Sequence, residues 1–181
     1  MKRWGMPILA GVVIAAAAHF MTLQAAPGFI MGRAMEAMKQ RGVPLHAFIL
    51  TPRTTPQTQT VVRPSPDLAY SVCRFDFSQL DGPLVVRMAA WDRYSSLSFF
   101  DAETNNFLTL RGDGELREVV LHGPEMKAPD GARAPSAKGL ILIRRLAPSR
   151  ADYARVTGVS ASDLCAAGPF PVQPAALEPE A

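Results

Sequence analysis

The sequence predicts a mainly β fold, an antiparallel β-sandwich or barrel-like domain, with an N-terminal transmembrane helix and a short C-terminal helix. Two observations lead to this prediction. Six or seven short runs between residues 61 and 146 alternate apolar and polar residues and are separated by turn residues, a pattern typical of sandwiches and barrels. An uninterrupted apolar run over residues 7–23 precedes them, and no regular alternation of strands with helices is present.

The size and charge of the chain exclude several classes of protein. Its 181 residues, 48% of them hydrophobic, suffice for one ordinary domain and are too apolar for a wholly disordered chain. Of the 19 basic residues, Lys2 and Arg3 precede the apolar run, so 17 basic and 16 acidic residues remain beyond it. Because this remainder is nearly neutral and has no basic face, we expect no nucleic-acid partner.

The apolar run over residues 7–23 contains no charged residue and is close to the length of a helix that crosses a bilayer. We expect residues 1–26 to form a transmembrane anchor, with the lipid bilayer as the partner of residues 7–23. A cleaved signal peptide is the alternative. It is less favoured because cleavage after Ala25 places Leu23 where a small residue is preferred, and cleavage one residue later places Gln24 there.

Basic residues on both sides of the apolar run bear on its orientation. Lys2 and Arg3 precede the run and favour a cytoplasmic amino terminus. Arg33, Lys39 and Arg41 follow it and favour the opposite orientation. Because the charges ahead of a first helix usually dominate, we expect a single-pass protein of the inner membrane, with its C-terminal domain in the periplasm.

A juxtamembrane helix is expected within residues 27–50, with Gly42 as a plausible stop for its clearest part. Two arrangements stay open: the helix continues the membrane helix outward, or it lies on the bilayer. Three methionines fall on one face of this helix: Met31, Met35 and Met38. Such a stripe could hold a soft metal ion, but it is far more often a packing face. Residues 51–60, rich in Thr, Pro and Gln, are expected to form a spacer.

The β-rich domain is expected over residues 61–167. Its strands are expected at residues 60–64, 69–77, 84–89, 94–100, 106–110, 117–123 and 139–146. Turn signals lie at residues 81–83 (Asp-Gly-Pro) and 111–114 (Arg-Gly-Asp-Gly). Ser149 is expected to cap a short helix. Residues 168–181, with four prolines, are expected to form a disordered tail.

The two cysteines are candidates for a disulfide if the domain is exported. Cys73 lies within an expected strand and Cys165 follows the final short helix. In an oxidising compartment they could pair and close a loop of about 93 residues. The alternative is two buried free thiols.

No sequence motif of a common catalytic or metal site is present, and we expect neither a cofactor nor a metal ion. The candidate polar residues fall into two clusters along the chain. Asp67 and Tyr70 belong to the first, and Asp92, Arg93 and Tyr94, followed by Asp101 and Asn105, belong to the second. Asp92 and Asp101 flank one strand, which puts them about 30 Å apart and excludes an acid–base pair. Asp67 with Asp92 stays open because both precede strands. Asp101 to Asn105 lies in a loop without the glycine and glutamate of a calcium site, so a self-capped polar hairpin is favoured.

Several of these residues belong to a pattern that resembles a bacterial family, domain of unknown function 1254. In order along the chain they are residues 65–70 (Ser-Pro-Asp-Leu-Ala-Tyr), 82–86 (Gly-Pro-Leu-Val-Val), 92–94 (Asp-Arg-Tyr) and 101–105 (Asp-Ala-Glu-Thr-Asn). The resemblance covers about residues 60–146. It implies a β-rich envelope protein and no particular activity.

Two departures from the family pattern are Ser65, where the family has Asn, and Leu68, where it has Thr. The chain is also short. It resembles a membrane-anchored, single-domain version of the family, without the companion domain of longer relatives. A second, separately encoded half could replace that domain.

Two interpretations of function follow. The favoured one is a membrane-anchored protein of the cell envelope that works as a non-enzymatic binding or interaction module, with a possible protein partner there. The alternative is an envelope enzyme whose site consists of Asp67, Tyr70, Asp92, Arg93 and Tyr94. The enzyme interpretation requires these side chains to converge on one concave pocket.

Overall fold

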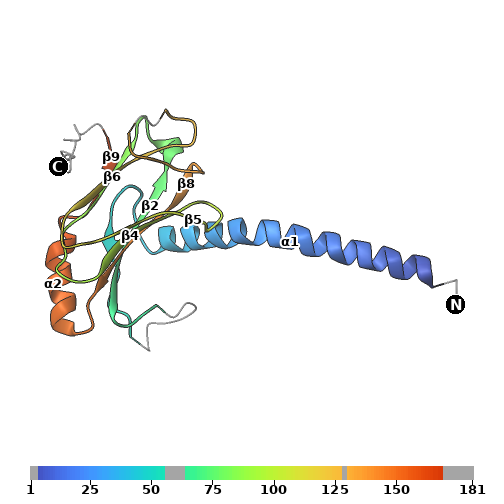
Figure 1. Ribbon diagram of the computed structural model, residues 1–181, viewed down its shortest axis with the longest axis horizontal. Helices are drawn as coiled ribbons and strands as arrows, with labels where there is room; N and C mark the ends of the chain where they lie inside the picture. Colours follow the sequence, from blue (N-terminus) through green and yellow to red (C-terminus); the bar gives the residue numbers. More distant parts are fainter. Residues whose placement is uncertain (1–3, 56–63, 128–129, 169–181) are drawn as a thin grey trace, which may run out of the picture.

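The computed structural model of the chain describes residues 4–55, 64–127 and 130–168 (Figure 1). Two sheets of mostly antiparallel strands pack as a sandwich, so the predicted mainly β fold is confirmed. A long apolar helix, α1 (Gly5–Gln40), precedes the sandwich, and a short helix, α2 (Arg150–Ser160), lies near its C-terminal end. A single 3-10 turn, Phe77–Gln79, follows the first long strand.

The two sheets differ in size and in the length of their strands. Sheet A has five strands in the order β1 (Ile49–Leu50), β2 (Leu68–Asp76), β8 (Lys138–Leu146), β4 (Ser95–Phe100) and β5 (Asn106–Arg111). Sheet B has four strands in the order β7 (Ala132–Arg133), β6 (Arg117–His122), β3 (Leu84–Met88) and β9 (Leu164–Ala167). The nine-residue strands β2 and β8 pair over their whole length, which makes them the centre of sheet A.

The core lies between the two sheets and explains the period-two pattern. In β2, Cys73 and Phe75 are fully buried between the sheets, and opposite them on β8 stand Ile141 and Gly139. Arg74 lies between them in sequence and therefore points to the outer face of sheet A. The Cys73–Cys165 disulfide joins β2 of sheet A to β9 of sheet B across this core.

Helix α1 is one continuous helix that combines the expected anchor with the juxtamembrane segment. The helix expected within residues 27–50 is corrected in its extent, since α1 ends at Gln40 and β1 begins at Ile49. Gly42 adopts a left-handed backbone conformation (φ 78°), which glycine accepts without strain and which ends the helix. Ile49 then pairs with Val72, so the end of that segment joins the sheet.

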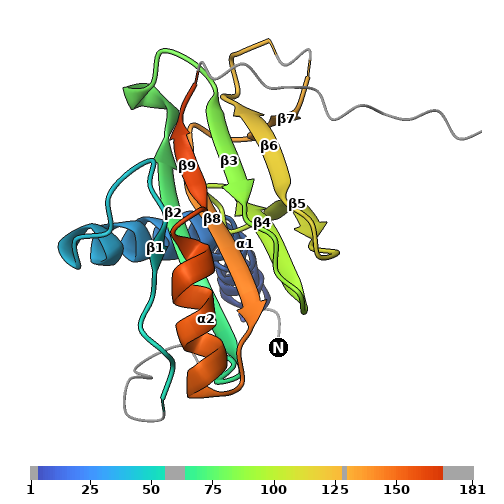
Figure 2. The same ribbon diagram turned by 90° about the vertical axis from the view of Figure 1, so that its left-hand side faces the viewer.

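Helix α1 projects away from the sandwich on the side of sheet A (Figure 1). Viewed at right angles, the strands of sheet B lie in front and α1 lies behind the sandwich (Figure 2). The helix is long and apolar enough to cross a membrane, and none of the residues in its most apolar stretch is buried by the rest of the protein. At about 1.5 Å per residue its 36 residues give a length of about 54 Å.

One observed strand was not expected, part of the expected spacer is ordered on the sandwich, and two expected segments lie almost wholly outside the described residues. β9 was not expected, because four residues (Leu-Cys-Ala-Ala) are too short to show a strand period. Residues 51–55 of the expected spacer lie on the sandwich, where Thr51 donates its backbone N–H to the Tyr70 carbonyl (2.8 Å). The strand expected at residues 60–64 and the tail at 168–181 fall outside the described residues, apart from Pro64 and Gly168.

Gly139 of β8 marks the tightest approach in sheet A and gives a stability prediction. A Cβ atom there would lie 2.2 Å from the Phe100 carbonyl oxygen and 2.5 Å from the Phe75 ring. We expect Gly139→Ala to lower the free energy of unfolding by about 1–3 kcal/mol, because backbone must move. Urea titration followed by circular dichroism measures this. Gly158→Ala is the matched control, since nothing lies within 4 Å of its Cβ position in α2, and it should stabilise by about 0.5–1 kcal/mol. Equal effects at both sites would contradict the prediction.

Candidate functional site

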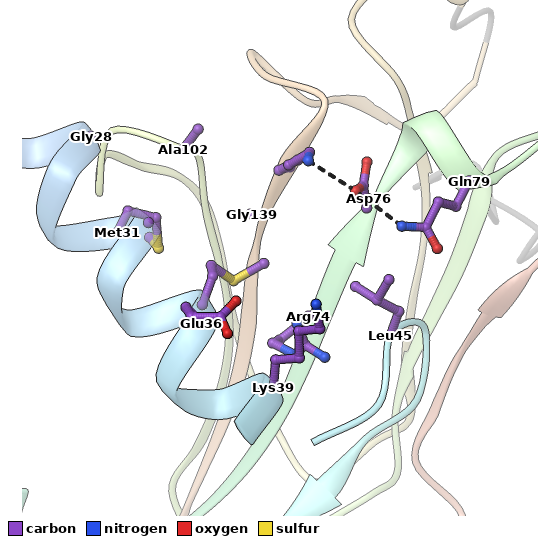
Figure 3. A pocket seen from close by; sticks show the side chains of 13 residues that line it. Gly28, Met31, Glu36, Lys39, Leu45, Arg74, Asp76, Gln79, Ala102 and Gly139 are labelled. Carbon is purple, nitrogen blue, oxygen red and sulfur yellow. Dashed lines mark hydrogen bonds and ion pairs between the residues drawn. The ribbon is translucent and has the colours of Figure 1, made fainter. Parts of the chain in front are cut away.

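A cavity of about 620 Å³ lies between the C-terminal half of α1 and the outer face of sheet A (Figure 3). We call it the junction cavity. Its helix side is formed by Gly28, Met31, Gly32, Met35, Glu36 and Lys39. Its other walls are formed by Leu45, Arg74, Asp76, Gln79, Ala102, Lys138 and Gly139. The cavity therefore exists only because the helix that could span a membrane also packs against the sandwich.

The expected methionine stripe supplies the contact that closes the cavity on the helix side. Met31 is buried, with 7% of its surface exposed, and Met35 is half-buried. Gly28 lies one turn before Met31, and a Cβ atom there would sit 4.0 Å from the Ala102 carbonyl oxygen. The loop after β4 thus meets α1 at Gly28, and the methionines act as a packing face.

Asp76 is the best-compensated charge in the junction cavity. Its carboxylate accepts hydrogen bonds from the Ser78 backbone N–H (3.0 Å) and hydroxyl (2.6 Å), and pairs with Lys138 at 3.2 Å. Burial raises the pKa of this carboxyl, but the hydrogen bonds from Ser78 and Lys138 outweigh that effect and hold the pKa below its usual range. Asp76 is therefore ionised at neutral pH, and its hydrogen bonds with Ser78 hold the carboxylate in place beside Lys138.

Arg74 is a buried cation that lacks an acidic partner. Only 7% of its surface is exposed, and its Nε and Nη2 atoms both donate to the Val43 carbonyl oxygen. Within residues 4–55, 64–127 and 130–168, no carboxylate lies within 4.0 Å of its guanidinium. The same holds for Lys39, which is exposed at the cavity rim. The cavity lining thus contains three cations, Lys39, Arg74 and Lys138, and two carboxylates, Glu36 and Asp76.

A neutral histidine supports the strand that carries Arg74 and Asp76. The Nε2 atom of His46 accepts a hydrogen bond from the Asp76 backbone N–H at 3.1 Å. Burial lowers the pKa of His46, and this keeps the ring in its neutral form at pH 7. Because a protonated ring could not accept this bond, the neutral form is the one that fits the geometry.

The candidate residues expected from the sequence lie at opposite ends of sheet A. The backbone carbonyls of Asp67 and Tyr94 accept from Ala147 and Leu146 at the end of β8, so the group near residues 67 and 92–94 shares one end. Asp101 follows β4 at the other end. Its carboxylate accepts from the backbone N–H groups of Glu103 and Asn105, both at 2.8 Å, and from the Asn105 amide at 2.9 Å. The Asp101 side chain thus caps the backbone of its own loop, as in a self-capped polar hairpin.

Of the candidate residues at the first end of sheet A, Asp92 and Arg93 pair with helix α2, and the Tyr94 hydroxyl donates to Ser96 at 3.4 Å. Asp92 binds Arg155 at 2.6 Å, and Arg93 binds Asp152 at 2.9 Å. The Tyr70 hydroxyl accepts from the Ser65 backbone N–H at 2.9 Å. Two partners in these pairs, Asp152 and Arg155, were not among the expected site residues. The Ser-x-x-Asp spacing at residues 149–152 could have indicated Asp152, because it is the pattern of a capping box.

A second cavity of about 320 Å³ lies beside this group and is lined by Trp91, Asp92 and Arg155. The Arg155 guanidinium sits 4.9 Å from the centre of the Trp91 ring. The hydrogen bond from Arg155 holds the pKa of Asp92 below its usual range. Asp67 and Tyr70 are not among the residues that line this cavity. The five residues of the enzyme interpretation therefore do not share it.

The capping box of α2 gives a pH-dependent prediction. Ser149 donates its hydroxyl to Asp152 at 2.7 Å and accepts the Asp152 backbone N–H at 3.0 Å. The hydrogen bond from Ser149, with a contribution from Arg93, holds the pKa of Asp152 below its usual range. A lowered pKa in the folded state adds stability above about pH 4, and this stability is lost as the pH falls through the lowered value.

We therefore expect Ser149→Ala to lower stability at pH 7, by about 1 kcal/mol for a lost N-cap. The difference from the wild type should shrink as the pH falls from about 4 toward 2, because Asp152 becomes protonated in both proteins. Urea midpoints measured across this range test the prediction. Ser160→Ala, at the other end of α2, is the control. A stability difference between Ser149→Ala and the wild type that stays constant down to pH 2 would contradict a contribution from ionised Asp152.

Comparisons with known proteins place this geometry in context. The model of the family described as Protein of unknown function (DUF1254) matches residues 46–165. The solved structure of the VPA0106 protein from Vibrio parahaemolyticus is 13% identical, with a TM-score of 0.51 over 84% of this chain and 40% of that chain. An uncharacterised protein from Burkholderia cenocepacia is 19% identical, with a TM-score of 0.43 over 71% of this chain and 39% of that chain. The chain thus spans about two fifths of these solved chains. The comparison with curated proteins gave no match.

Proposed function

This chain belongs to the family described as Protein of unknown function (DUF1254), and we propose that it is a membrane-anchored, non-enzymatic binding module of the cell envelope. In this proposal α1 crosses the inner membrane once through residues 7–23. The sandwich stands in the periplasm, and its binding site is the junction cavity. The observation that carries the proposal is that the same helix provides an exposed apolar span and one wall of a polar cavity.

The exposed surface of α1 supports a bilayer as its partner. Along its most apolar stretch the side chains of Ile8, Leu9, Val12, Val13, Ile14 and Phe20 are each about 60–70% exposed. Large apolar side chains gathered in this number are unfavourable in water, and a hydrocarbon environment removes that cost. The stretch has the length that a bilayer core requires.

The disulfide and the basic residues support the periplasm as the location of the sandwich. Cys73 and Cys165 form a disulfide, and such bonds persist in oxidising compartments. Lys2 and Arg3 ahead of the span favour a cytoplasmic amino terminus, which leaves the rest of the chain on the other side.

The ion pairs of the candidate polar residues favour binding over catalysis. Asp92 and Arg93 are each engaged by a residue of α2, so their charges hold that helix to the sandwich. A catalytic carboxylate needs a pKa matched to proton transfer, whereas the pKa of Asp92 is lowered by Arg155.

A protein partner in the envelope could add to sheet A. β5 (Asn106–Arg111) is an edge strand of six residues, and no described strand pairs with its outer edge. An extended segment of another protein can hydrogen-bond to such an edge. We propose this edge as the place for a protein partner.

Topology mapping with thiol labelling tests the proposal. The full chain is fused at its C-terminus to a reporter that is active only in the periplasm and, separately, to one that is active only in the cytoplasm. A maleimide is then applied to the membranes dissolved in denaturant, with and without reductant, because both cysteines are buried in the folded domain. We expect periplasmic reporter activity and labelling of Cys73 and Cys165 only after reduction. A cytoplasmic C-terminus with freely labelled thiols would overturn the proposal.

A further inference from the structure

We propose that the protein partner of β5 is a second copy of this chain, and that the two β5 strands pair antiparallel about a two-fold axis through Thr109. The inference rests on the proposed function, which places a protein partner at β5, and it names that partner. Its observations are the open backbone edge of β5, the apolar groove beside that edge, and the direction in which α1 leaves sheet A.

β5 is the longest edge strand in the part of the chain that the structure describes. It has six residues, whereas the edge strands β1, β7 and β9 have two, two and four. Short strands, prolines and charged residues are common protections of a sheet edge. β5 contains no proline, and its single charged residue, Arg111, lies at its end. A further strand therefore gains more backbone hydrogen bonds on β5 than on any other described edge.

The register of β5 on β4 shows which backbone groups of β5 face outward. Gly112 donates its N–H to the Ser95 carbonyl at 2.9 Å, so residue 112 bonds to the β4 side. Bonded and non-bonded residues alternate along an antiparallel strand. Leu110 therefore bonds to β4, and Thr109 and Arg111 direct their N–H and C=O groups away from it. These outward groups are free to bond to another strand, since no turn or loop of the described residues bonds to them.

The sequence of β5 is complementary to itself in the register centred on Thr109. Thr109 then faces its own copy and exchanges both backbone hydrogen bonds with it. Leu108 faces Leu110 of the second copy, and both side chains lie on the core side of sheet A. Arg111 faces Phe107 of the second copy, so the pairing brings no like charges together.

An apolar groove of about 340 Å³ lies beside the edge of β5. Leu108 of β5 and Ala132 of β7 both line it, so edges of the two sheets lie on the same side of the sandwich. Val119 and Val120 of β6 also line it, and all four side chains are half-buried. A second copy paired at β5 sets its own groove opposite this one, and covering both removes apolar surface from water.

The direction of α1 favours a second copy as the occupant of this edge. α1 leaves the outer face of sheet A (Figure 1), and it is foreshortened in the view in which the strands face the reader (Figure 2). The helix therefore runs closer to the normal of the sheet than to its plane. The two-fold axis that joins two edge strands into one continuous sheet is also normal to the sheet. Both copies of α1 then project on the same side, as anchoring in one membrane requires.

The pairing leaves room for both helices where they meet the sheets. α1 lies against sheet A at Gly139 of β8 and Arg74 of β2. In the joined sheet, five strand spacings separate the two β8 strands, which is about 24 Å. A helix with its side chains is about 10–12 Å wide, so the two copies of α1 do not collide there.

Cross-linking at Thr109 tests the inference in membranes that contain the full chain. Facing residues of a hydrogen-bonded pair have Cα atoms about 5.5 Å apart, a distance that a disulfide can span. With a membrane-permeant oxidant, Thr109→Cys should give a product of twice the monomer mass that reductant splits. The matched control is Thr157→Cys, since Thr157 is exposed on α2 and should stay monomeric. Equal products from both variants, or none from Thr109→Cys, would overturn the inference.

A charge exchange at the same position tests whether Thr109 faces itself. Thr109→Lys and Thr109→Asp each place two like charges opposite each other, and each should weaken self-association in an uncharged detergent about tenfold. A mixture of the two variants should associate at least as strongly as the wild type. Light scattering across a concentration series measures the mass. Because Thr109 is exposed, both variants should fold. Variants that associate as the wild type does would overturn the inference.

The outcomes separate this inference from the proposed function. A cross-link from Thr109→Cys to a different protein would overturn the second copy and leave β5 as the surface for that protein. A permeant oxidant reaches both sides of the membrane, so a reversed α1 leaves the cross-link unaffected. A monomeric protein, in turn, overturns the pairing and leaves the single-pass anchor and the junction cavity untouched.

Discussion

Replacing both Cys73 and Cys165 by alanine is expected to lower the free energy of unfolding by about 4–5 kcal/mol. The disulfide closes a loop with a sequence separation of 92 residues and ties β2 of sheet A to the edge strand β9 of sheet B. Removing it frees the unfolded chain over that loop. Both positions are buried in the core, so the loss of the two sulfur atoms adds to the effect.

Urea denaturation of the full chain in detergent, followed by near- and far-ultraviolet circular dichroism, measures this loss. The reduced wild-type protein is the control, because it loses the bond and keeps the sulfur atoms. Reduced wild type and the double alanine variant should both unfold at clearly lower urea. A double variant as stable as the oxidised wild type would refute a structural role for the bond.

Asp163→Asn is expected to lower the free energy of unfolding by about 3–5 kcal/mol, because it leaves Arg145 as an uncompensated buried charge. The pair is almost completely buried, with 1% and 0% of the two side chains exposed, and its shortest contact is 2.6 Å. Both side chains also bind the backbone of Ala89: Asp163 accepts its N–H at 3.0 Å and Arg145 donates to its carbonyl at 3.0 Å. The pair thus joins β8, the end of β3 and the approach to β9.

Two variants separate the charge from the packing. The double change Arg145→Met with Asp163→Leu should recover much of the loss, since no buried charge remains. Asp113→Asn breaks the exposed pair with Arg117 and should cost no more than about 1 kcal/mol. The same urea denaturation measures the free energy of unfolding of all three variants. If Asp163→Asn lowers the free energy of unfolding as little as Asp113→Asn does, the buried pair contributes no more to stability than the exposed pair.

The sequence predicted the candidate site only in its separate parts. The expected residues were chosen as polar side chains near strand ends, and in the structure Asp92 and Arg93 form ion pairs with residues of α2. The junction cavity was missed. Arg74 belongs to a strand that reads as an ordinary core strand, Lys138 directly precedes another expected strand, and Lys39 appeared only as a charge bearing on orientation. Their proximity depends on pairing Asp76 with Lys138 across β2 and β8, a register that no local pattern contains.

By itself, the sequence determined the elements that depend on local periodicity. The methionine stripe and the alternation in β2 and β8 record which face of an element is buried, the uncharged run of α1 marks a possible membrane span, and Ser149 marks the start of α2. The resemblance to the DUF1254 family rested on short motifs in a fixed order, and it was confirmed over residues 46–165.

Only the tertiary structure decided which of these elements meet. The pairing of β2 and β4 with β8 brings Asp67 and Tyr94 to one end of sheet A, and the packing of α1 on the outer face of that sheet creates the junction cavity. β9 is recognisable as a strand only because it pairs with β3 and carries Cys165 to Cys73. The physical reason is that periodicity reflects burial along a single element, whereas sites arise from contacts between elements far apart in the chain.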